Sequence, residues 1–260
     1  MPTSTITLVP SETPTVEPSF TPTATARVKV TTTPMPNTTT YPGEWFEFGG
    51  GRVRAWARLD ADGHPHAIGV QFSEEMLSEL PISLKRITMA LPPEAGVSPF
   101  YNVDLDWRPQ GHSPKEYLKP HFDFRFFLIT EDDRNLIKDE HFDTNYIKPD
   151  PKYVPAFYAP AETTVRVDQY LGQRFWSMKS PEVDGDPFIQ SLNFGFWHGH
   201  LVYVEPMITL AFLESRENYV GEILQSREYE KSGFYPTMYR IEYIADSGEY
   251  IISLEKFVER

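Results

Sequence analysis

Cysteine is absent from the 260 residues of this chain, which excludes disulfide scaffolds, thiolate zinc sites, iron–sulfur clusters and cysteine nucleophiles. No run approaches the roughly 18 apolar residues of a spanning helix, so we expect no membrane insertion. Basic residues are scarce, since 24 Lys and Arg against 37 Asp and Glu give a net charge of −13. Because a nucleic-acid binder needs a basic surface, we expect no nucleic-acid partner. The chain also has no serine-hydrolase, zinc-protease, Walker or Rossmann motif that would assign a reaction.

Apolar and aromatic residues are rare near the N-terminus, where the first 40 residues contain 14 Thr, 7 Pro and 3 Ser. Such a segment cannot bury enough surface to offset its ordering entropy, so residues 1–43 are predicted to be a disordered, extended stalk. Thr/Pro/Ser tracts often follow a secretion signal or lipid anchor, yet the first residues lack a basic and an apolar region. We expect an extracytoplasmic or cell-surface location, with the signal or anchor not included in this sequence; a cytosolic protein with a tail is the alternative.

Residues 44–260 contain nearly all the aromatic residues, and apolar residues alternate there with polar ones with a period of two. Apolar Val53, Ala55, Ala57 and Leu59 alternate with larger or charged residues, and a turn at 60–63 leads to a second such run. The pattern predicts an all-β fold with one short helix at 74–80, arranged as an antiparallel sandwich or barrel, in one β-rich domain or two packed β subdomains. Further strands are predicted at residues 83–89, 102–107, 122–130, 191–197, 200–213, 239–245 and 249–257.

The segment at 120–128 places a polar row on an aromatic strand. His121, Asp123 and Arg125 share one face, while phenylalanines occupy the other. A strand this aromatic is expected to be central, so its polar row must find partners. The row is either a structural ion pair steadied by histidine or the lining of a pocket.

Glu205 interrupts a nearly continuous apolar run at 200–210. A buried carboxylate must be paired, protonated or bound to a metal. Pro206 cannot donate to a ladder, so a bulge or local sheet edge is expected beside it. The pair His198 and His200 resembles a metal-binding pair, but its spacing around Gly199 is typical of an exposed hairpin turn.

Several sequence blocks follow one another in a characteristic order. They are W-A-R-L-D-A at 56–61, A-I-G-V at 67–70, L-D-W at 105–107, Q-G-H-S-P at 110–114, P-H-F-D-F at 120–124, P-E-V-D-G at 181–185, E-P-M-I-T at 205–209 and I-S-L-E at 252–255. In this order they resemble a family of uncharacterised bacterial β-rich proteins, most of which carry secretion signals and one of which, a thermophile member under an extracytoplasmic-stress sigma factor, is a homodecamer. The resemblance implies a β-rich fold, secretion and homo-oligomerisation.

The resemblance also implies a metal-ligand set, because the family pattern reads H-F-D-F-H, G-x-H-W and E-P-M. These motifs correspond to His121, Arg125, Arg174 and Glu205 here, so two of four ligand positions are arginine. Because arginine cannot ligate a metal at accessible pH, we expect the metal site to be lost and no cofactor to be present.

A pocket is therefore expected, and its residues are His112, His121, Asp123, Arg125, Arg174 and Glu205. Arg125 and Arg174 either hold a small anionic ligand, for which guanidinium is suited, or neutralise Asp123 and Glu205 internally. The expected function is an extracytoplasmic binding or structural module that forms homo-oligomers. The alternative is a hydrolase or isomerase on a small anionic substrate, with His121 as general base oriented by Asp123.

Overall fold

Two antiparallel sheets of seven strands each form the fold in a computed structural model, which describes residues 37–260 except 94–95, 97–98, 139, 142–145 and 162–165. The first sheet has the strand order β1-β3-β4-β16-β15-β14, with β2 paired to β3, and the second has the order β5-β6-β7-β13-β12-β11-β9. The first sheet consists of β1 (Thr39–Pro42), β2 (Phe46–Phe48), β3 (Gly51–Leu59), β4 (Pro65–Ser73), β14 (Tyr219–Glu222), β15 (Phe234–Ile244) and β16 (Glu249–Glu259). The second consists of β5 (Lys85–Ala90), β6 (Asn102–Arg108), β7 (His121–Phe127), β9 (Tyr158–Pro160), β11 (Gln173–Ser177), β12 (Gln190–Trp197) and β13 (His200–Thr209).

The core lies between the two sheets, because each strand turns its apolar residues inward. The ring of Phe72 on β4 stacks against that of Phe124 on β7, with 6.1 Å between the ring centroids. Phe48 meets Phe122 in the same layer at 6.3 Å. Both sheets have free ends in their strand order, so the predicted all-β antiparallel fold is confirmed as a sandwich and not a barrel. The sheets are the two layers of one unit, residues 34–260.

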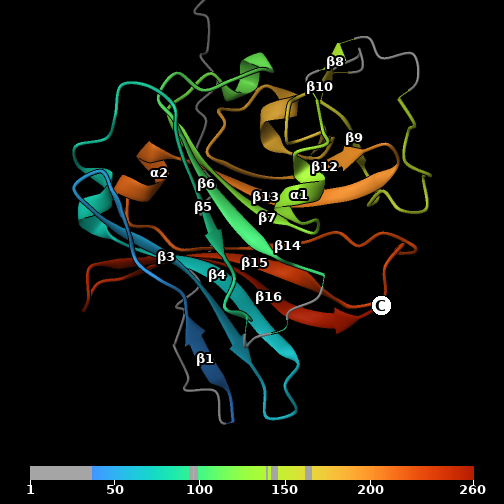
Figure 1. The fold of residues 1–260 in the computed structure, drawn as a ribbon. Helices are drawn as coiled ribbons and strands as arrows, with labels where there is room; N and C mark the ends of the chain where they lie inside the picture. Colours follow the sequence, from blue (N-terminus) through green and yellow to red (C-terminus); the bar gives the residue numbers. More distant parts are fainter. Residues whose placement is uncertain (1–36, 94–95, 97–98, 139, 142–145, 162–165) are drawn as a thin grey trace, which may run out of the picture. The chain divides into compact units, whose positions relative to one another are not determined.

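The outer face of the second sheet is covered by loops and short elements. These are α1 (Glu131–Arg134), β8 (Glu140–His141), β10 (Arg166–Val167) and the 3-10 turns Lys115–Tyr117 and Pro181–Asp184. In Figure 1, α1, β8 and β10 lie on the side of the second sheet that faces away from the first. Two smaller apolar clusters form under this cover, one around Tyr203 and one around Met207. The polar row of β7 is on this outer face and is therefore buried as well.

Several predicted boundaries differ from the structure. The predicted strand 200–213 ends at Thr209, where α2 (Leu210–Glu214) begins because the Thr209 hydroxyl accepts a hydrogen bond from the Phe212 amide. The predicted helix 74–80 is a 3-10 turn, Glu74–Leu77, and Ser73 does not cap it with its side chain. Among the described residues, no helix is long and apolar enough to cross a membrane.

The predicted stalk, residues 1–43, lies mostly outside the described part of the chain. Its last residues do form structure, since Thr39–Pro42 is strand β1 and pairs with β3. Tyr41 packs against the core, so residues 39–42 are part of the first sheet. The Thr/Pro-rich composition did not predict strand β1, because only one aromatic side chain anchors it.

Gly195 is a glycine that the packing of β12 requires. A Cβ atom at this position would lie 2.1 Å from the ring of Tyr203 on β13, which is buried and held among neighbouring side chains. Gly195→Val is therefore expected to destabilise the fold by roughly 1–3 kcal/mol through overpacking. Urea denaturation measures the loss, and Gly63→Asn is the control, because no atom lies near its Cβ position and asparagine tolerates the positive φ of this turn. Equal stability of Gly195→Val and the wild type would contradict this packing.

Candidate functional site

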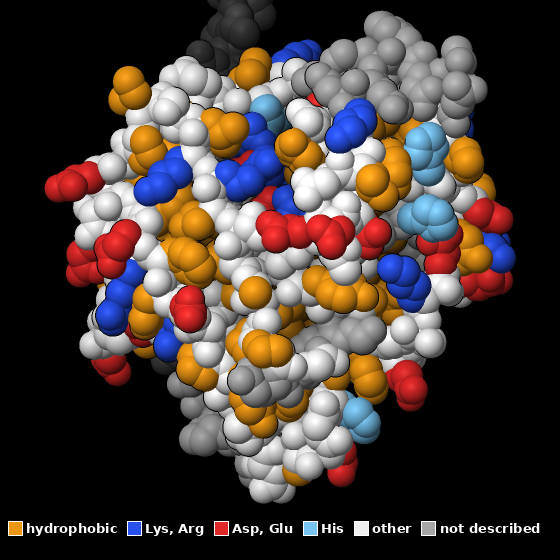
Figure 2. All heavy atoms as spheres, viewed as in Figure 1, with side chains coloured by type: hydrophobic (Ala, Val, Ile, Leu, Met, Phe, Trp, Pro, Cys, Tyr) orange, Lys and Arg blue, Asp and Glu red, His pale blue; other side chains and the backbone are white. Residues whose placement is uncertain are grey.

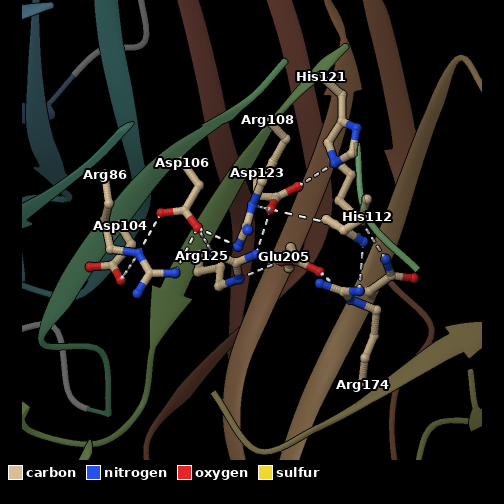
Figure 3. A network of polar contacts seen from close by, with 12 residues as sticks. Arg86, Asp104, Asp106, Arg108, His112, His121, Asp123, Arg125, Arg174 and Glu205 are labelled. Atoms are coloured by element: carbon tan, nitrogen blue, oxygen red, sulfur yellow. Dashed lines mark hydrogen bonds and ion pairs between the residues drawn. The ribbon is translucent and has the colours of Figure 1, made fainter. Parts of the chain in front are cut away.

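A network of buried ion pairs covers the outer face of the second sheet (Figure 3). It forms because adjacent strands place polar residues at matching positions, such as Asp106 opposite Asp123 and Asp104 opposite Arg125. Four carboxylates in it have no exposed surface: Asp104, Asp106, Asp123 and Glu205. Five guanidinium groups neutralise them: Arg86, Arg108, Arg125, Arg134 and Arg174.

Arg125 lies at the centre of this network and is fully buried. Its Nη1 donates to Asp106 Oδ2 at 2.7 Å, and its Nη2 donates to Asp123 Oδ2 at 2.5 Å. Its Nε lies 2.5 Å from Glu205 Oε1 on the neighbouring strand β13. Burial alone would lower the pKa of Arg125, but Glu205, Asp123 and Asp106 outweigh it and raise this pKa above its ordinary value. Arg125 thus holds three strands together through three carboxylates.

The remaining arginines surround this centre. Arg86 on β5 donates to both oxygens of Asp106, from Nε at 2.5 Å and from Nη2 at 2.7 Å. Arg108 on β6 bridges two carboxylates, with Nη2 at 2.8 Å from Asp106 and Nε at 3.2 Å from Asp123. Arg134 closes the network at Asp104 from helix α1.

Glu205 contacts an arginine on each side. Of the three possibilities for a buried carboxylate, namely paired, protonated or bound to a metal, the contacts correspond to the first. Arg174 on β11 donates from Nε to Glu205 Oε2 at 3.1 Å, opposite the contact with Arg125. The ladder between β7 and β13 has no pair for Glu205 or Pro206, because proline cannot donate a hydrogen bond. The register is the same on both sides of this gap and β13 lies inside the sheet, so the prediction of a bulge or sheet edge beside Pro206 is wrong. The two arginines therefore neutralise Glu205 internally, as one of the two expectations had it.

Two histidines complete the site beside Asp123. His121 is fully buried, its Nδ1 is 2.7 Å from the carbonyl oxygen of Lys119, and its Nε2 is 2.9 Å from Asp123 Oδ1. The Nε2 of His112 lies 3.6 Å from Asp123 Oδ2. Burial and the nearby Arg174 lower the pKa of His112, so its ring is uncharged at neutral pH.

A cavity of about 240 Å³ opens beside the network. Its walls include the side chains of Arg86, Arg108, His112 and Arg174, together with one carboxylate, Asp168. Figure 2 shows basic side chains gathered on the upper part of the viewed face, over the second sheet. The structure thus places Arg174 and His112 on a cavity wall, while His121, Asp123, Arg125 and Glu205 are buried in the network.

Acid is expected to destabilise the protein through Asp106. Burial would raise the pKa of Asp106, but Arg125, Arg86 and Arg108 outweigh it and lower this pKa to about 2. A carboxyl with a depressed folded pKa stabilises the fold above its unfolded pKa near 3.9, and this contribution is lost as pH falls through the folded pKa. Between about pH 5 and pH 2 the free energy of unfolding should fall by roughly 2–3 kcal/mol from this group alone. Urea midpoints across this range measure the loss, and a flat profile would contradict it.

The metal-ligand set implied by the family resemblance does not fit these residues. Arg125 and Arg174 stand at two of its four positions, and both bind Glu205, the third. Only His121 keeps a free ligand atom, so these four positions cannot form a metal site.

All six residues predicted for the site lie together. Five further residues take part in the network and were not predicted: Arg86, Asp104, Asp106, Arg108 and Arg134. Three of these were detectable, because β6 reads N-V-D-L-D-W-R, with Asp104, Asp106 and Arg108 alternating with apolar residues as in β7. Arg86 and Arg134 gave no comparable signal, since each is a single arginine in an ordinary polar context.

Comparisons with known proteins give one similarity. A family model described as TTHB210-like, hypothetical protein TTHB210, matches residues 60–107, which include β4, β5 and all of β6 but its last residue, and thus Arg86, Asp104 and Asp106. The comparisons with curated proteins and with solved structures gave no match. Over residues 60–107, the chain is similar to a family of hypothetical proteins, in agreement with the resemblance to an uncharacterised family.

Proposed function

We propose that this protein is a binding module for a small anionic ligand, held in the cavity beside the ion network. The observation that carries the proposal is the presence of three guanidinium groups on the cavity wall, Arg86, Arg108 and Arg174, against one carboxylate. Guanidinium is suited to carboxylate and phosphate because its planar fork matches their oxygens. The rest of the protein is strongly acidic, so this cluster stands out against a net charge of −13.

The hydrogen-bond pattern supports an additional partner. Arg86 and Arg108 reach the network through Nε and Nη2, and Arg174 uses Nε and Nη1. These contacts involve neither Nη1 of Arg86, nor Nη1 of Arg108, nor Nη2 of Arg174. The network carboxylates fix the three side chains in place, so the ligand would meet donors that are already ordered.

The alternative function, a hydrolase with His121 as general base, has less support from the geometry. His121 has no exposed surface and is not among the residues that line the cavity. A general base must come within hydrogen-bond reach of the proton it abstracts. We therefore favour binding over catalysis.

Thermal unfolding in the presence of inorganic phosphate tests the proposal. A ligand that binds only the folded state raises the free energy of unfolding by about 2.7 kcal/mol when its concentration is 100 times its Kd. For a chain of this size, the melting temperature should rise by about 5 °C or more. Sodium chloride at matched ionic strength is the control, and equal shifts in the two salts would contradict a specific anion site.

We further propose that the protein acts outside the cytoplasm and self-associates. The Thr/Pro-rich composition of residues 1–40 supports the location. Self-association is supported by apolar residues beside the edge strand β5, since Ile82 is 94% exposed and Leu84 is 50% exposed.

Sedimentation velocity at micromolar concentration is expected to show a species larger than the 30.0 kDa chain. Ile82→Asp with Leu84→Asp should shift the distribution toward the monomer, because a charge there opposes apolar contact. A single monomeric species of the wild type at all concentrations would contradict self-association.

A further inference from the structure

Three buried polar atoms point toward one another beside Asp123 without hydrogen-bond partners. They are Nε2 of His112, Nε2 of His121 and Oδ1 of Asp123. Together they form a group of possible ligand atoms that all lie within 4.8 Å of one another. In Figure 3 both imidazole rings are turned toward the Asp123 carboxylate. A buried polar atom without a partner is costly, so such a convergence calls for a missing partner.

The other atoms of these three side chains are already occupied, which leaves these atoms available. The Nδ1 of His121 faces the carbonyl oxygen of Lys119, and the Nδ1 of His112 faces that of Ser113, each at 2.7 Å. A carbonyl can only accept, so a proton on each Nδ1 leaves a lone pair on each Nε2. The Nη1 of Arg174, which can only donate, also lies 3.1 Å from His112 Nδ1, so a metal ion on His112 Nε2 requires the tautomer that faces the Ser113 carbonyl and displaces this arginine contact. A backbone carbonyl on the far nitrogen is the usual outer support of a metal-binding histidine.

The Asp123 carboxylate also has one oxygen occupied and the other facing the histidines. Its Oδ2 accepts from Arg125 at 2.5 Å and from Arg108 at 3.2 Å. These two contacts fix the carboxylate so that Oδ1 lies 2.9 Å from His121 Nε2. The two atoms are not aligned as a hydrogen bond, although they are close enough to share a ligand.

We propose that His112, His121 and Asp123 bind a divalent transition-metal ion, with zinc as the best match. Two imidazole nitrogens and one carboxylate oxygen are a common zinc donor set, and the fourth position stays open. Zinc bonds of about 2.0–2.1 Å require ligand atoms roughly 3.3 Å apart in a tetrahedron. The separation of 2.9 Å between His121 Nε2 and Asp123 Oδ1 is close to that value, while His112 Nε2 lies 3.6 Å from the other oxygen of the same carboxylate, Oδ2.

This site differs from the four positions implied by the family resemblance, and it borders the cavity of the proposed anion binding through His112. It shares only His121 with those positions, and it uses no arginine. His112 also lines the cavity, so an ion can reach the site past this ring. The adjacent guanidinium groups oppose a cation, which limits the expected affinity.

Equilibrium dialysis of the full chain against zinc chloride in phosphate-free buffer, followed by metal analysis, tests the proposal. We expect one zinc ion per chain at this site and a zinc-dependent rise in melting temperature. His112→Ala should weaken this binding at least tenfold, because it leaves one imidazole and one carboxylate. His112 is partly exposed, and His112→Asn is the second variant in case the alanine variant does not fold.

A second cluster supplies the matched control. Asp60, Asp62 and His64 lie in the turn between β3 and β4 and are largely exposed. Within this turn, Asp60 Oδ1 accepts hydrogen bonds from the backbone amides of Asp62 and His64. His64→Ala should leave binding at the proposed site unchanged. The proposal is overturned if the wild type binds no zinc, in which case the cluster is only an imidazolium–carboxylate pair. It is also overturned if His64→Ala reduces binding as much as the His112 variants do.

Discussion

Arg125→Met is expected to unfold the protein or to leave it close to unfolding. The substitution removes the only cation that contacts Asp106, Asp123 and Glu205 together, among the described residues, and all three carboxylates are fully buried. Removing one partner of a single buried ion pair costs roughly 3–5 kcal/mol, because the remaining charge has no water around it. Total stabilities are about 5–15 kcal/mol, so a change that affects three pairs removes most or all of the margin.

Urea denaturation followed by circular dichroism measures this effect. Arg240→Met is the matched control, because Arg240 forms a similar two-point pair with Glu255 on the first sheet, in a more exposed position. Surface pairs contribute about 0–1 kcal/mol, so this variant should remain folded. If Arg125→Met were as stable as Arg240→Met, the buried network would not hold the second sheet together.

Arg108→Met combined with Arg174→Met is expected to weaken phosphate binding at least 100-fold. Each charge-assisted hydrogen bond contributes about 1.5–3 kcal/mol, so the loss of two guanidinium groups removes most of the binding energy. The double variant is expected to fold with reduced stability, because three guanidinium groups then face four buried carboxylates, while Asp106 keeps Arg86 and Arg125, and Asp123 and Glu205 keep Arg125.

Isothermal titration calorimetry with phosphate gives this ratio directly. Arg54→Met is the control, since the Arg54 guanidinium binds Gln71 on the first sheet and takes no part in the cavity. Unchanged phosphate affinity in the double variant would place any anion site elsewhere on the protein.

The longer strands of the fold were predictable because each is buried on at least one face, whereas the short strands β1, β2, β9, β11 and β14 were not predicted. The alternation at 102–107 and 122–130 marks strands whose apolar residues enter the core between the sheets. The helix at Leu210–Glu214 was not predictable in this way, since its apolar residues continue the pattern of β13 without a break. One threonine side chain, Thr209, decides where the strand ends.

The candidate site was predictable only in part, for a physical reason. The polar row of β7 required buried partners, and that requirement identified His121, Asp123 and Arg125 as a group. Which strands supply the partners depends on sheet order, and β7 lies between β6 and the distant β13. Period-two alternation carries no information on that order, so Arg86 and the cavity could not be derived from it.

A crystal structure of the protein with tungstate, an anion that resembles phosphate and has a strong anomalous signal, tests the central claim most directly. The account predicts an anomalous peak in the cavity, within hydrogen-bond distance of Arg86, Arg108 and Arg174, and an unchanged ion network around Arg125. A cavity without a peak at tungstate concentrations that saturate other surface sites, or guanidinium groups turned away from the cavity, would contradict it.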